Sequence, residues 1–242
     1  MSHQRFIVAS DIHGDQQHGP ANEVLFKFID LWKPQIRICA GDLWDLRPLR
    51  GKASDDEKRE SLREDFTAGV KWFNRFKPHH FIRGNHDERL WELAERDDGV
   101  RSDYAQELIG RVDAMLAHHK CSVLPYHKRD GVLRIGSLKV LHGFAAGVYA
   151  SRATALIYGS CLFGHVHTID EHAIPGLERR VARSIGCLCR LDLEYADRMP
   201  TTLRHAHGFA YGVLDSRTGR YHVWQAESVD GKWLLPSDLV TL

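Results

Sequence analysis

Short apolar runs alternate with helix-like segments over the first half of the chain. The runs at residues 5–10, 35–42 and 79–87 are typical of buried strands, and the third leads into a loop. Apolar residues at helical spacing predict helices over residues 20–33, 54–76, 88–96 and 104–119. The helix at 54–76 has Ser54 as a candidate cap and acidic residues in its first turn. This alternation indicates an α/β fold.

Strand-like segments dominate the second half of the chain. Residues 132–143 are typical of a hairpin, and residues 155–167 of a helix end followed by a strand. From residue 181 onward we expect mainly strands, with 208–216 and 220–228 joined by the turn Ser-Arg-Thr-Gly. The second half is therefore predicted to be rich in β-structure.

The chain is expected to form one domain over residues 1–242. Its length suits a single large domain, and no internal repeat, low-complexity tract or clear linker divides it. A hydrophobic content of 43% is normal for a globular protein. A charged, helical insert is predicted at about residues 46–78, where it would overhang a site built from the flanking segments.

Charge and cysteine content narrow the class of protein. The 33 basic residues nearly balance the 32 acidic ones, so no overall field attracts nucleic acid. The five cysteines are irregularly spaced and form no Cys-x-x-Cys pair, which favours a reduced environment. No signal peptide and no apolar stretch as long as a membrane helix is visible. We therefore expect a cytoplasmic protein without membrane contact.

Side chains that can bind metals follow nearly every predicted strand of the alternating part. They are Asp11, His13, Asp42, Asp45, Asn85, His86, Asp87, His142, His165 and His167. In α/β sheets ligands bind outside the carboxyl ends of the strands, so these side chains are expected at one edge of the fold. Each motif alone can be an ordinary turn or a buried core residue. Their combination in this order predicts a metal site.

The same residues give the chain a resemblance to a known family. Five blocks resemble the signature of the calcineurin-like metallophosphoesterases: Asp11-x-His13, Gly41-Asp42-x-x-Asp45, Gly84-Asn85-His86-Asp87, His142-Gly143 and Gly164-His165-x-His167. The blocks span residues 11–167. The resemblance implies a two-sheet β-sandwich flanked by helices, in α/β/β/α layers.

The resemblance also implies two divalent metal ions. The first would be bound by Asp11, His13 and His167, the second by Asn85, His142 and His165, and Asp42 would bridge the two. We expect Val166, between two ligands on an extended segment, to point towards the core by strand alternation. Ligation by nitrogen and oxygen without thiolate suits Mn, Fe, Zn, Co or Ni, of which we favour Mn²⁺.

Such a centre can hydrolyse a phosphoester. Two cations about 3.5–4 Å apart lower the pKa of a bridging water and neutralise the phosphoryl oxygens, so a metal-bridging hydroxide would be the nucleophile. By the resemblance, His86 is not a ligand but faces the leaving group, where it can protonate the departing alkoxide. Asp45 would orient His86 through the other ring nitrogen, unless it is a surface turn residue.

The substrate is less clearly indicated. Protein Ser/Thr phosphatases of the superfamily carry Arg-Gly after the second aspartate of the second block and glutamate at the end of the third. This chain has Leu46-Arg47 and Asp87 there, and is more similar to small bacterial and phage members, many of which prefer phosphodiesters. We therefore expect a phosphodiesterase or phosphatase for a nucleotide-like or other small organic phosphate. Arg47, Arg83 and Arg89 could clamp phosphate oxygens or form structural ion pairs.

Three alternatives remain beside this hypothesis. A nuclease similar to the repair exonucleases of the superfamily is disfavoured by the near-zero net charge. A non-catalytic scaffold is disfavoured because every ligand and His86 are present, and a lipid-precursor pyrophosphatase because no amphipathic membrane helix is evident. His205 and His207 match no family block, and we expect them in a loop or at a strand end near the mouth of the site.

Overall fold

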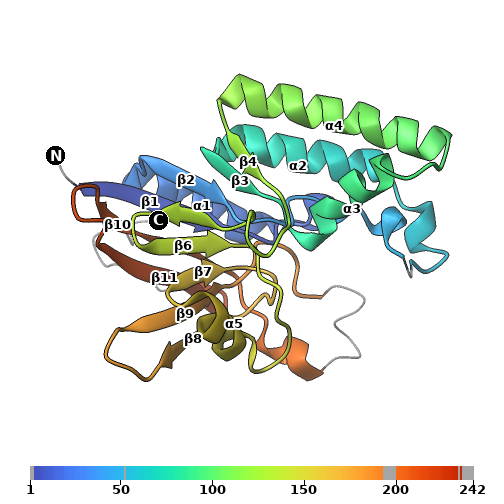
Figure 1. Cartoon of the computed structure of the whole chain (residues 1–242). Helices are drawn as coiled ribbons and strands as arrows, with labels where there is room; N and C mark the ends of the chain where they lie inside the picture. Colours follow the sequence, from blue (N-terminus) through green and yellow to red (C-terminus); the bar gives the residue numbers. More distant parts are fainter. Residues whose placement is uncertain (1–2, 52, 193–199, 234, 236–242) are drawn as a thin grey trace.

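The computed structural model describes residues 3–51, 53–192, 200–233 and 235 (Figure 1). Two β-sheets pack against each other, and helices cover the outer face of each sheet. The predicted α/β fold, with a two-sheet sandwich between helical layers, is therefore confirmed. Among the residues described, no helix is long and apolar enough to cross a membrane.

The larger sheet has seven strands in the order β12-β11-β10-β1-β2-β3-β4. These strands are β1 (His3–Ala9), β2 (Ile36–Cys39), β3 (His80–Ile82), β4 (Ser122–Leu124), β10 (Gly208–Asp215), β11 (Tyr221–Val229) and β12 (Lys232–Trp233). β1 to β4 run parallel, whereas β10 pairs with β1 in the antiparallel direction. The carboxyl ends of β1, β2 and β3 therefore meet at one edge of the sheet.

The smaller sheet has five strands in the order β5-β6-β7-β9-β8. They are β5 (Leu133–Ile135), β6 (Leu138–Leu141), β7 (Cys161–Phe163), β8 (Ile169–Ile174) and β9 (Arg180–Ile185). β5 and β6 form the hairpin predicted over residues 132–143, while β6, β7 and β9 run parallel. β6 and β7 thus end at a common edge, as the parallel strands of the larger sheet do.

Five α-helices connect the strands within the described part of the chain. They are α1 (Gly19–Trp32), α2 (Leu62–Phe76), α3 (Asn85–Ala94), α4 (Val100–His119) and α5 (Ala150–Tyr158), with short 3₁₀ turns at η1 (Gly14–Gln16), η2 (Arg47–Leu49), η3 (Glu57–Arg59) and η5 (Pro200–Arg204). Helices α1 to α4 pack on the larger sheet, and α5 packs on β8 and β9 of the smaller one (Figure 1).

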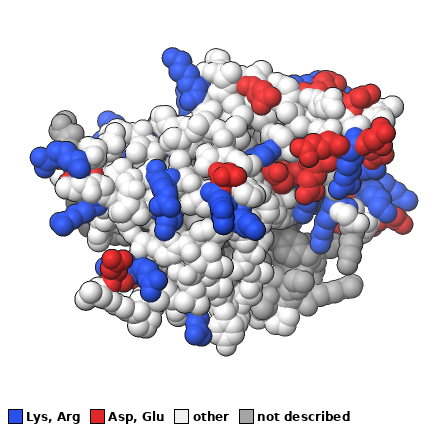
Figure 2. Space-filling view, in the orientation of Figure 1, with Lys and Arg blue, Asp and Glu red and all other residues white. Residues whose placement is uncertain are grey.

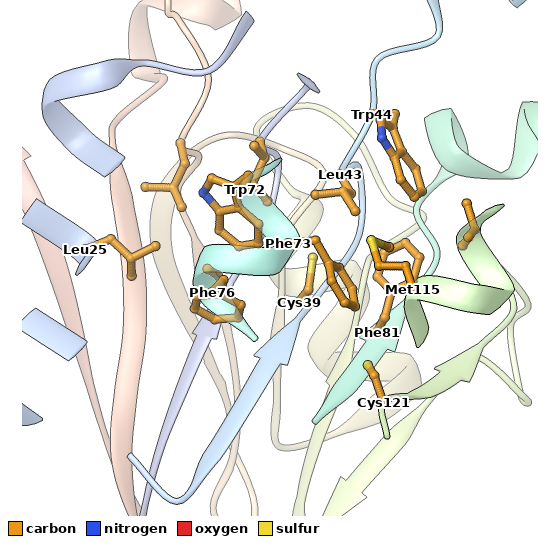
Figure 3. Packing of buried hydrophobic residues seen from close by; sticks show 14 of the residues in the cluster. Leu25, Cys39, Leu43, Trp44, Trp72, Phe73, Phe76, Phe81, Met115 and Cys121 are labelled. Atoms are coloured by element: carbon orange, nitrogen blue, oxygen red, sulfur yellow. The ribbon is translucent and has the colours of Figure 1, made fainter. Parts of the chain in front are cut away.

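Alternation along β1 divides the core into two layers. Phe6 and Val8 enter the cluster between the two sheets, whereas Ile7 and Ala9 enter the cluster under the helices. Figure 3 shows the helical side of this packing, where aromatic rings of α2 lie against residues of the sheet. The carboxyl end of β1 is therefore anchored on both faces, which fixes the position of the residues that follow it.

Two helix boundaries close to the predicted ligands differ from the sequence-based expectations. The helix expected over 54–76 starts later, because Ser61 caps α2 by accepting a hydrogen bond from the amide of Glu64, and the preceding residues form η3. The loop expected after the third strand is instead the first turn of α3, which begins at Asn85. Asn85 and His86 are therefore held on a helix rather than on a loop.

Three strands were not predicted. β4 has only three residues, β12 has only two, and β8 has three polar residues in succession, so none of them forms the apolar run that marks a buried strand. All three lie at an edge of their sheet, where one side of the strand has no partner.

Candidate metal centre

The carboxyl ends of five strands bring the predicted ligands together. Asp11 and His13 follow β1, Asp42 follows β2, Asn85 follows β3, His142 follows β6, and His165 and His167 follow β7. The amide of His165 donates to both carboxylate oxygens of Asp11, at 3.1 and 3.0 Å, across 154 positions of sequence. The site is thus built by both sheets.

Four of these side chains form a first group, namely Asp11, His13, Asp42 and His167. The Nε2 atoms of His13 and His167 lie 3.2 Å apart, and the Nε2 of His167 lies 3.3 Å from an oxygen of Asp11. The Nε2 of His13 is 3.8 Å from Oδ2 of Asp42. All four side chains are buried. Two imidazole nitrogens and two carboxylates lie close together here, and this donor set suits a divalent transition metal.

Asp42 also belongs to a second group, with Asn85, His142 and His165. The Nε2 of His142 lies 3.2 Å from Oδ2 of Asp42 and 3.0 Å from Oδ1 of Asn85, while Nδ1 of His165 lies 2.8 Å from that same Asn85 oxygen. The other ring nitrogen of His142 is 2.8 Å from the carbonyl oxygen of Ala40, which orients the ring. One Asp42 oxygen, Oδ2, therefore faces both groups.

The backbone of the candidate ligands adopts an uncommon conformation. Five of the seven have φ in the left-handed region: Asp11 (56°), His13 (53°), Asp42 (50°), His165 (72°) and His167 (55°). Such a conformation costs a non-glycine residue on the order of 1 kcal/mol or more, and it is retained mainly where the surrounding structure imposes it. The concentration of these residues at the strand ends marks the site independently of their side-chain chemistry.

The segment that carries His165 and His167 is not extended, contrary to the expectation. β7 ends at Phe163, and the amide of Val166 donates to the carbonyl oxygen of Gly164 at 2.8 Å, which makes a tight turn. Val166 does pack against the apolar cluster between the smaller sheet and α5. The two histidines reach different groups because of this turn, and strand alternation is the wrong explanation.

Two glycines allow the close approach of the ligand segments. A side chain on Gly84 would collide with the carboxylate of Asp42, and one on Gly164 would collide with the carboxylate of Asp11. Gly84 and Gly164 are therefore needed because a larger residue would not fit beside the ligands, and not because the backbone must be flexible there.

Buried charges are concentrated in this centre. Burial raises the pKa of Asp11, but contact with His167 outweighs that effect and lowers the pKa to about 2. Burial likewise opposes ionisation of Asp42, yet the charges of His142 and His86 hold its pKa well below the usual range. Burial lowers the pKa of His165 to about 4. The carboxylates are thus ionised and His165 is neutral, which are the forms that bind a cation. For His142 burial lowers the pKa, but the Asp42 carboxylate outweighs burial and raises the pKa to about 9, so this ring would lose a proton when a metal binds.

His86 lies beside both groups and is more exposed than the buried ligands. Its Nδ1 is 2.7 Å from Oδ1 of Asp45, and its Nε2 is 3.8 Å from Oδ2 of Asp42. The same Asp45 oxygen lies 3.3 Å from Nδ1 of His13. The guanidinium of Arg89 donates to the carbonyl oxygen of Asp45 at 2.8 Å. Asp45 therefore contacts the outer side of two histidine rings that face the centre.

The other two arginines of interest contact acidic side chains. Arg47 forms ion pairs with Asp45 at 2.9 Å, with Asp15 at 3.0 Å and with Glu60. Arg83 pairs with Glu88 at 3.1 Å, and its guanidinium lies 4.4 Å from the ring centroid of Trp91. Both arginines therefore form structural ion pairs, which was the alternative to clamping a phosphate oxygen.

Three residues near the centre were not singled out from the sequence, namely Ser10, Cys189 and Asp65, whereas His205 was expected near the mouth of the site. Ser10 donates to the Asp11 carboxylate at 2.5 Å, and the Sγ of Cys189 lies 3.8 Å from Nδ1 of His167. Asp65 of α2 accepts from the amides of Asp45 and Leu46, at 3.2 and 2.6 Å. The ring of His205 lies 5.1 Å from that of His167. Only the histidine pair at 205 and 207 carried a signal in the sequence.

Comparison with known proteins agrees with this geometry. The sequence profile described as calcineurin-like phosphoesterase matches residues 4–230. The chain belongs to the calcineurin-like phosphoesterase family. This assignment confirms the resemblance and places the protein in a family of metal-binding hydrolases. A comparison with curated protein sequences gives no match.

Solved structures of similar fold cover almost the whole phosphoesterase chain. A single mutant of Vps29 from Entamoeba histolytica has a TM-score of 0.50 and 12% identity, over 95% of this chain and 96% of its own. A metallophosphoesterase from Sphaerobacter thermophilus has a TM-score of 0.46 and 16% identity, over 99% and 97%. An archaeal phosphodiesterase has a TM-score of 0.44 and 13% identity, over 91% and 99%. At these identities the likeness concerns the fold.

Proposed function

We propose that this protein is a dinuclear metal-dependent phosphodiesterase or phosphatase acting on a nucleotide-like or other small organic phosphate. The observation that supports the proposal best is the position of Asp42, one oxygen of which faces two separate groups of ligands. A cytoplasmic location belongs to the same proposal and is supported by five cysteines that form no disulfide.

The donor set fits two divalent ions. Asp11, His13 and His167 would hold the first, Asn85, His142 and His165 would hold the second, and Asp42 would contact both. When bound, the ions, for which we favour Mn²⁺, would activate a water and neutralise the phosphoryl oxygens. Such cations would compensate the negative charge of the buried, ionised carboxylates. Buried charge without a compensating partner is strongly unfavourable.

The residues beside the ligands would handle the leaving group. His86 presents Nε2 towards the centre while Asp45 accepts from Nδ1, so the ring can give a proton to the departing alkoxide. Arg89, held by the Asp45 carbonyl oxygen, is the arginine that we propose for binding a phosphate oxygen. Arg47 and Arg83 have acidic partners, so we assign them to holding the surrounding loops.

Hydrolysis of bis(p-nitrophenyl) phosphate tests the proposal. The metal-free protein should gain activity on addition of Mn²⁺, with Fe, Zn, Co and Ni compared in parallel, and a chelator should abolish it. A protein that binds these metals at both groups yet hydrolyses no phosphoester would contradict the proposal. A screen of nucleotides, cyclic dinucleotides and short DNA then separates small-molecule hydrolysis from nuclease activity.

The surface supports a small substrate over nucleic acid. On the face drawn in Figure 2, Lys and Arg are interspersed with Asp and Glu, most densely around the insert and α3. Ion pairs within this region, such as Arg50 with Glu57 and Lys58 with Asp55, neutralise basic side chains that would otherwise attract a phosphate backbone.

A further inference from the structure

A hollow of about 440 Å³ lies next to the first group of ligands. Residues 17–19, 190–192 and His207 line it. The Nε2 of His207 lies 3.0 Å from the carbonyl oxygen of Cys189, and the Sγ of Cys189 lies 3.8 Å from Nδ1 of the ligand His167. Cys189 is therefore the single residue between His207, in the wall of the hollow, and His167, in the first group of ligands.

Two stacked imidazole rings form part of that wall. The rings of His18 and His207 are parallel within 9°, with centroids 4.1 Å apart. Nδ1 of His18 accepts a hydrogen bond from the amide of Ala21 at 3.3 Å, and His207 is held by the Cys189 carbonyl oxygen. Both rings are therefore fixed in place before any ligand binds. Fixed aromatic and imidazole surfaces favour planar ligands such as nucleobases.

His205 lies beside the ligand His167 and precedes His207 of the hollow by two residues. Its half-buried ring makes an edge contact with the ring of His167, with centroids 5.1 Å apart. Among the described residues, nothing hydrogen-bonds to its ring nitrogens. The amide of Ala206 donates to the carbonyl oxygen of His167 at 2.8 Å, which ties this segment to the site. His205 is thus available to bind an oxygen of a substrate whose phosphate lies at the first group.

We propose that this hollow is a subsite for the second ester group of a phosphodiester, the group that stays on the phosphate after hydrolysis. The subsite selects a planar substituent such as the base of a nucleoside, and His205 binds an oxygen between that substituent and the centre. In the reaction, the water oxygen bonds to phosphorus, the bond to the other ester oxygen breaks, and a proton passes to that leaving oxygen. This inference rests on the proposed function and names its substrate class.

A series of substrates with one leaving group tests the subsite. In methyl, phenyl and thymidine-5′ esters of p-nitrophenyl phosphate, only the retained group changes. Since stacking on one base contributes ~1–3 kcal/mol, kcat/KM for the thymidine ester should exceed that for the methyl ester by roughly tenfold or more.

Variants that remove the rings but keep their hydrogen bonds sharpen the test. In His207→Gln the amide can still donate to Cys189, and in His18→Asn the side chain can still cap α1. In both, the ratio of kcat/KM between the thymidine and methyl esters should fall towards one. His118→Gln, an exposed change near the end of α4, should keep the wild-type ratio.

The outcomes separate the two proposals. Equal kcat/KM for all three esters in the wild type, or an unchanged ratio in both ring variants, would overturn the subsite while the phosphoesterase proposal stands. Hydrolysis of none of the esters by metal-loaded protein would overturn both.

Discussion

Asp45 contacts two histidines through the same carboxylate oxygen. One of them, His13, belongs to the first ligand group, and the other, His86, is the proposed proton donor. A carboxylate in this position fixes the orientation of each ring and raises the basicity of its far nitrogen. Metal affinity and proton transfer are therefore linked through one residue, and substitutions can separate them.

His86→Ala should lower kcat for a phosphodiester with an alkyl leaving group by roughly 10²–10⁴-fold, the usual contribution of general acid catalysis, without loss of metal. The loss should be much smaller for bis(p-nitrophenyl) phosphate, because p-nitrophenolate leaves without being protonated. Asp45→Asn should lower kcat and also weaken binding at the first group by roughly 10–100-fold, because it disturbs His13 as well. Steady-state kinetics and metal analysis on the same preparations check both. A His86→Ala protein with the full rate on the diester with an alkyl leaving group would rule out the proposed role of His86.

The residue types of the site could be predicted from the sequence, but their local geometry could not. Each candidate ligand follows a recognisable strand, so the convergence of the side chains followed from the strand order. The left-handed backbone at His165 and His167 could not be foreseen, since left-handed residues other than glycine are uncommon. Cys189 and Ser10 were missed because their sequence surroundings are ordinary apolar runs.

At the scale of elements, helix α2 supports the centre from outside. Its Gly69 leaves room for the indole of Trp44, whose ring nitrogen donates to the carbonyl oxygen of Phe66 at 3.0 Å. Its Asp65 accepts from the amides of Asp45 and Leu46. The charged insert foreseen around residues 46–78 thus has a buried inner face that holds the loop carrying Asp45.

Two glycine-to-alanine changes in helices should have opposite effects. Gly110→Ala on α4 meets no atom within 4 Å and should raise the free energy of unfolding by ~0.5–1 kcal/mol, the propensity difference between the residues. Gly69→Ala should lower it by ~1–3 kcal/mol, since the added methyl group would overpack against the indole of Trp44. Urea denaturation of the three proteins decides this, and a stabilised Gly69→Ala variant would contradict the packing described.

Asp65 should make stability depend on pH in the acid range. Burial raises its pKa to about 6, well above the value of about 3.9 in an unfolded chain. The folded protein therefore holds an extra proton between these values, so the contribution of Asp65 to stability falls as pH rises from about 4 to 6.

Comparison with Asp65→Asn isolates that contribution, because asparagine does not titrate. The difference in free energy of unfolding, wild type minus variant, should fall by on the order of 2–3 kcal/mol from pH 4 to pH 6. Urea denaturation at each pH, with a chelator present throughout, measures it. A difference that is constant or rises with pH would show that the carboxyl titrates normally.

Element boundaries were the weakest part of the sequence-based prediction. Ser54 and Ser61 both precede acidic residues, and only the structure shows that Ser61 caps α2. Strands with continuous apolar runs, such as β1 and β10, were found, whereas the edge strand β8, with three polar residues in succession, was not. Local pattern identifies elements that are buried on both faces better than those at an edge.

At the scale of the whole molecule, the site requires both sheets. The larger sheet supplies Asp11, His13, Asp42 and Asn85, and the smaller one supplies His142, His165 and His167. The fold class could be predicted because the family blocks specify it, while the extent of each sheet depends on long-range pairing that no short segment encodes. Any ion bound here contacts both halves of the sandwich.

Metal binding should therefore stabilise the whole fold. Saturating Mn²⁺ at 100 times its dissociation constant should add about 2.7 kcal/mol, which appears as a higher Tm than that of the chelator-treated protein. Asp42→Asn should lose activity and most of this Tm shift, because it weakens both groups. Asp113→Asn, an exposed change on α4, should keep both. An equal Tm shift in Asp42→Asn and wild type would contradict the shared role of Asp42.

His13 and His167 face each other across 154 positions of the chain. A cation held between them closes that loop as a cross-link does, but reversibly and at a strength set by metal supply. Proteins whose unfolded fraction rises are removed faster by cellular proteases. We therefore expect the cellular lifetime of this phosphoesterase to follow the availability of its metal, so that the cell keeps mainly the copies that are able to work.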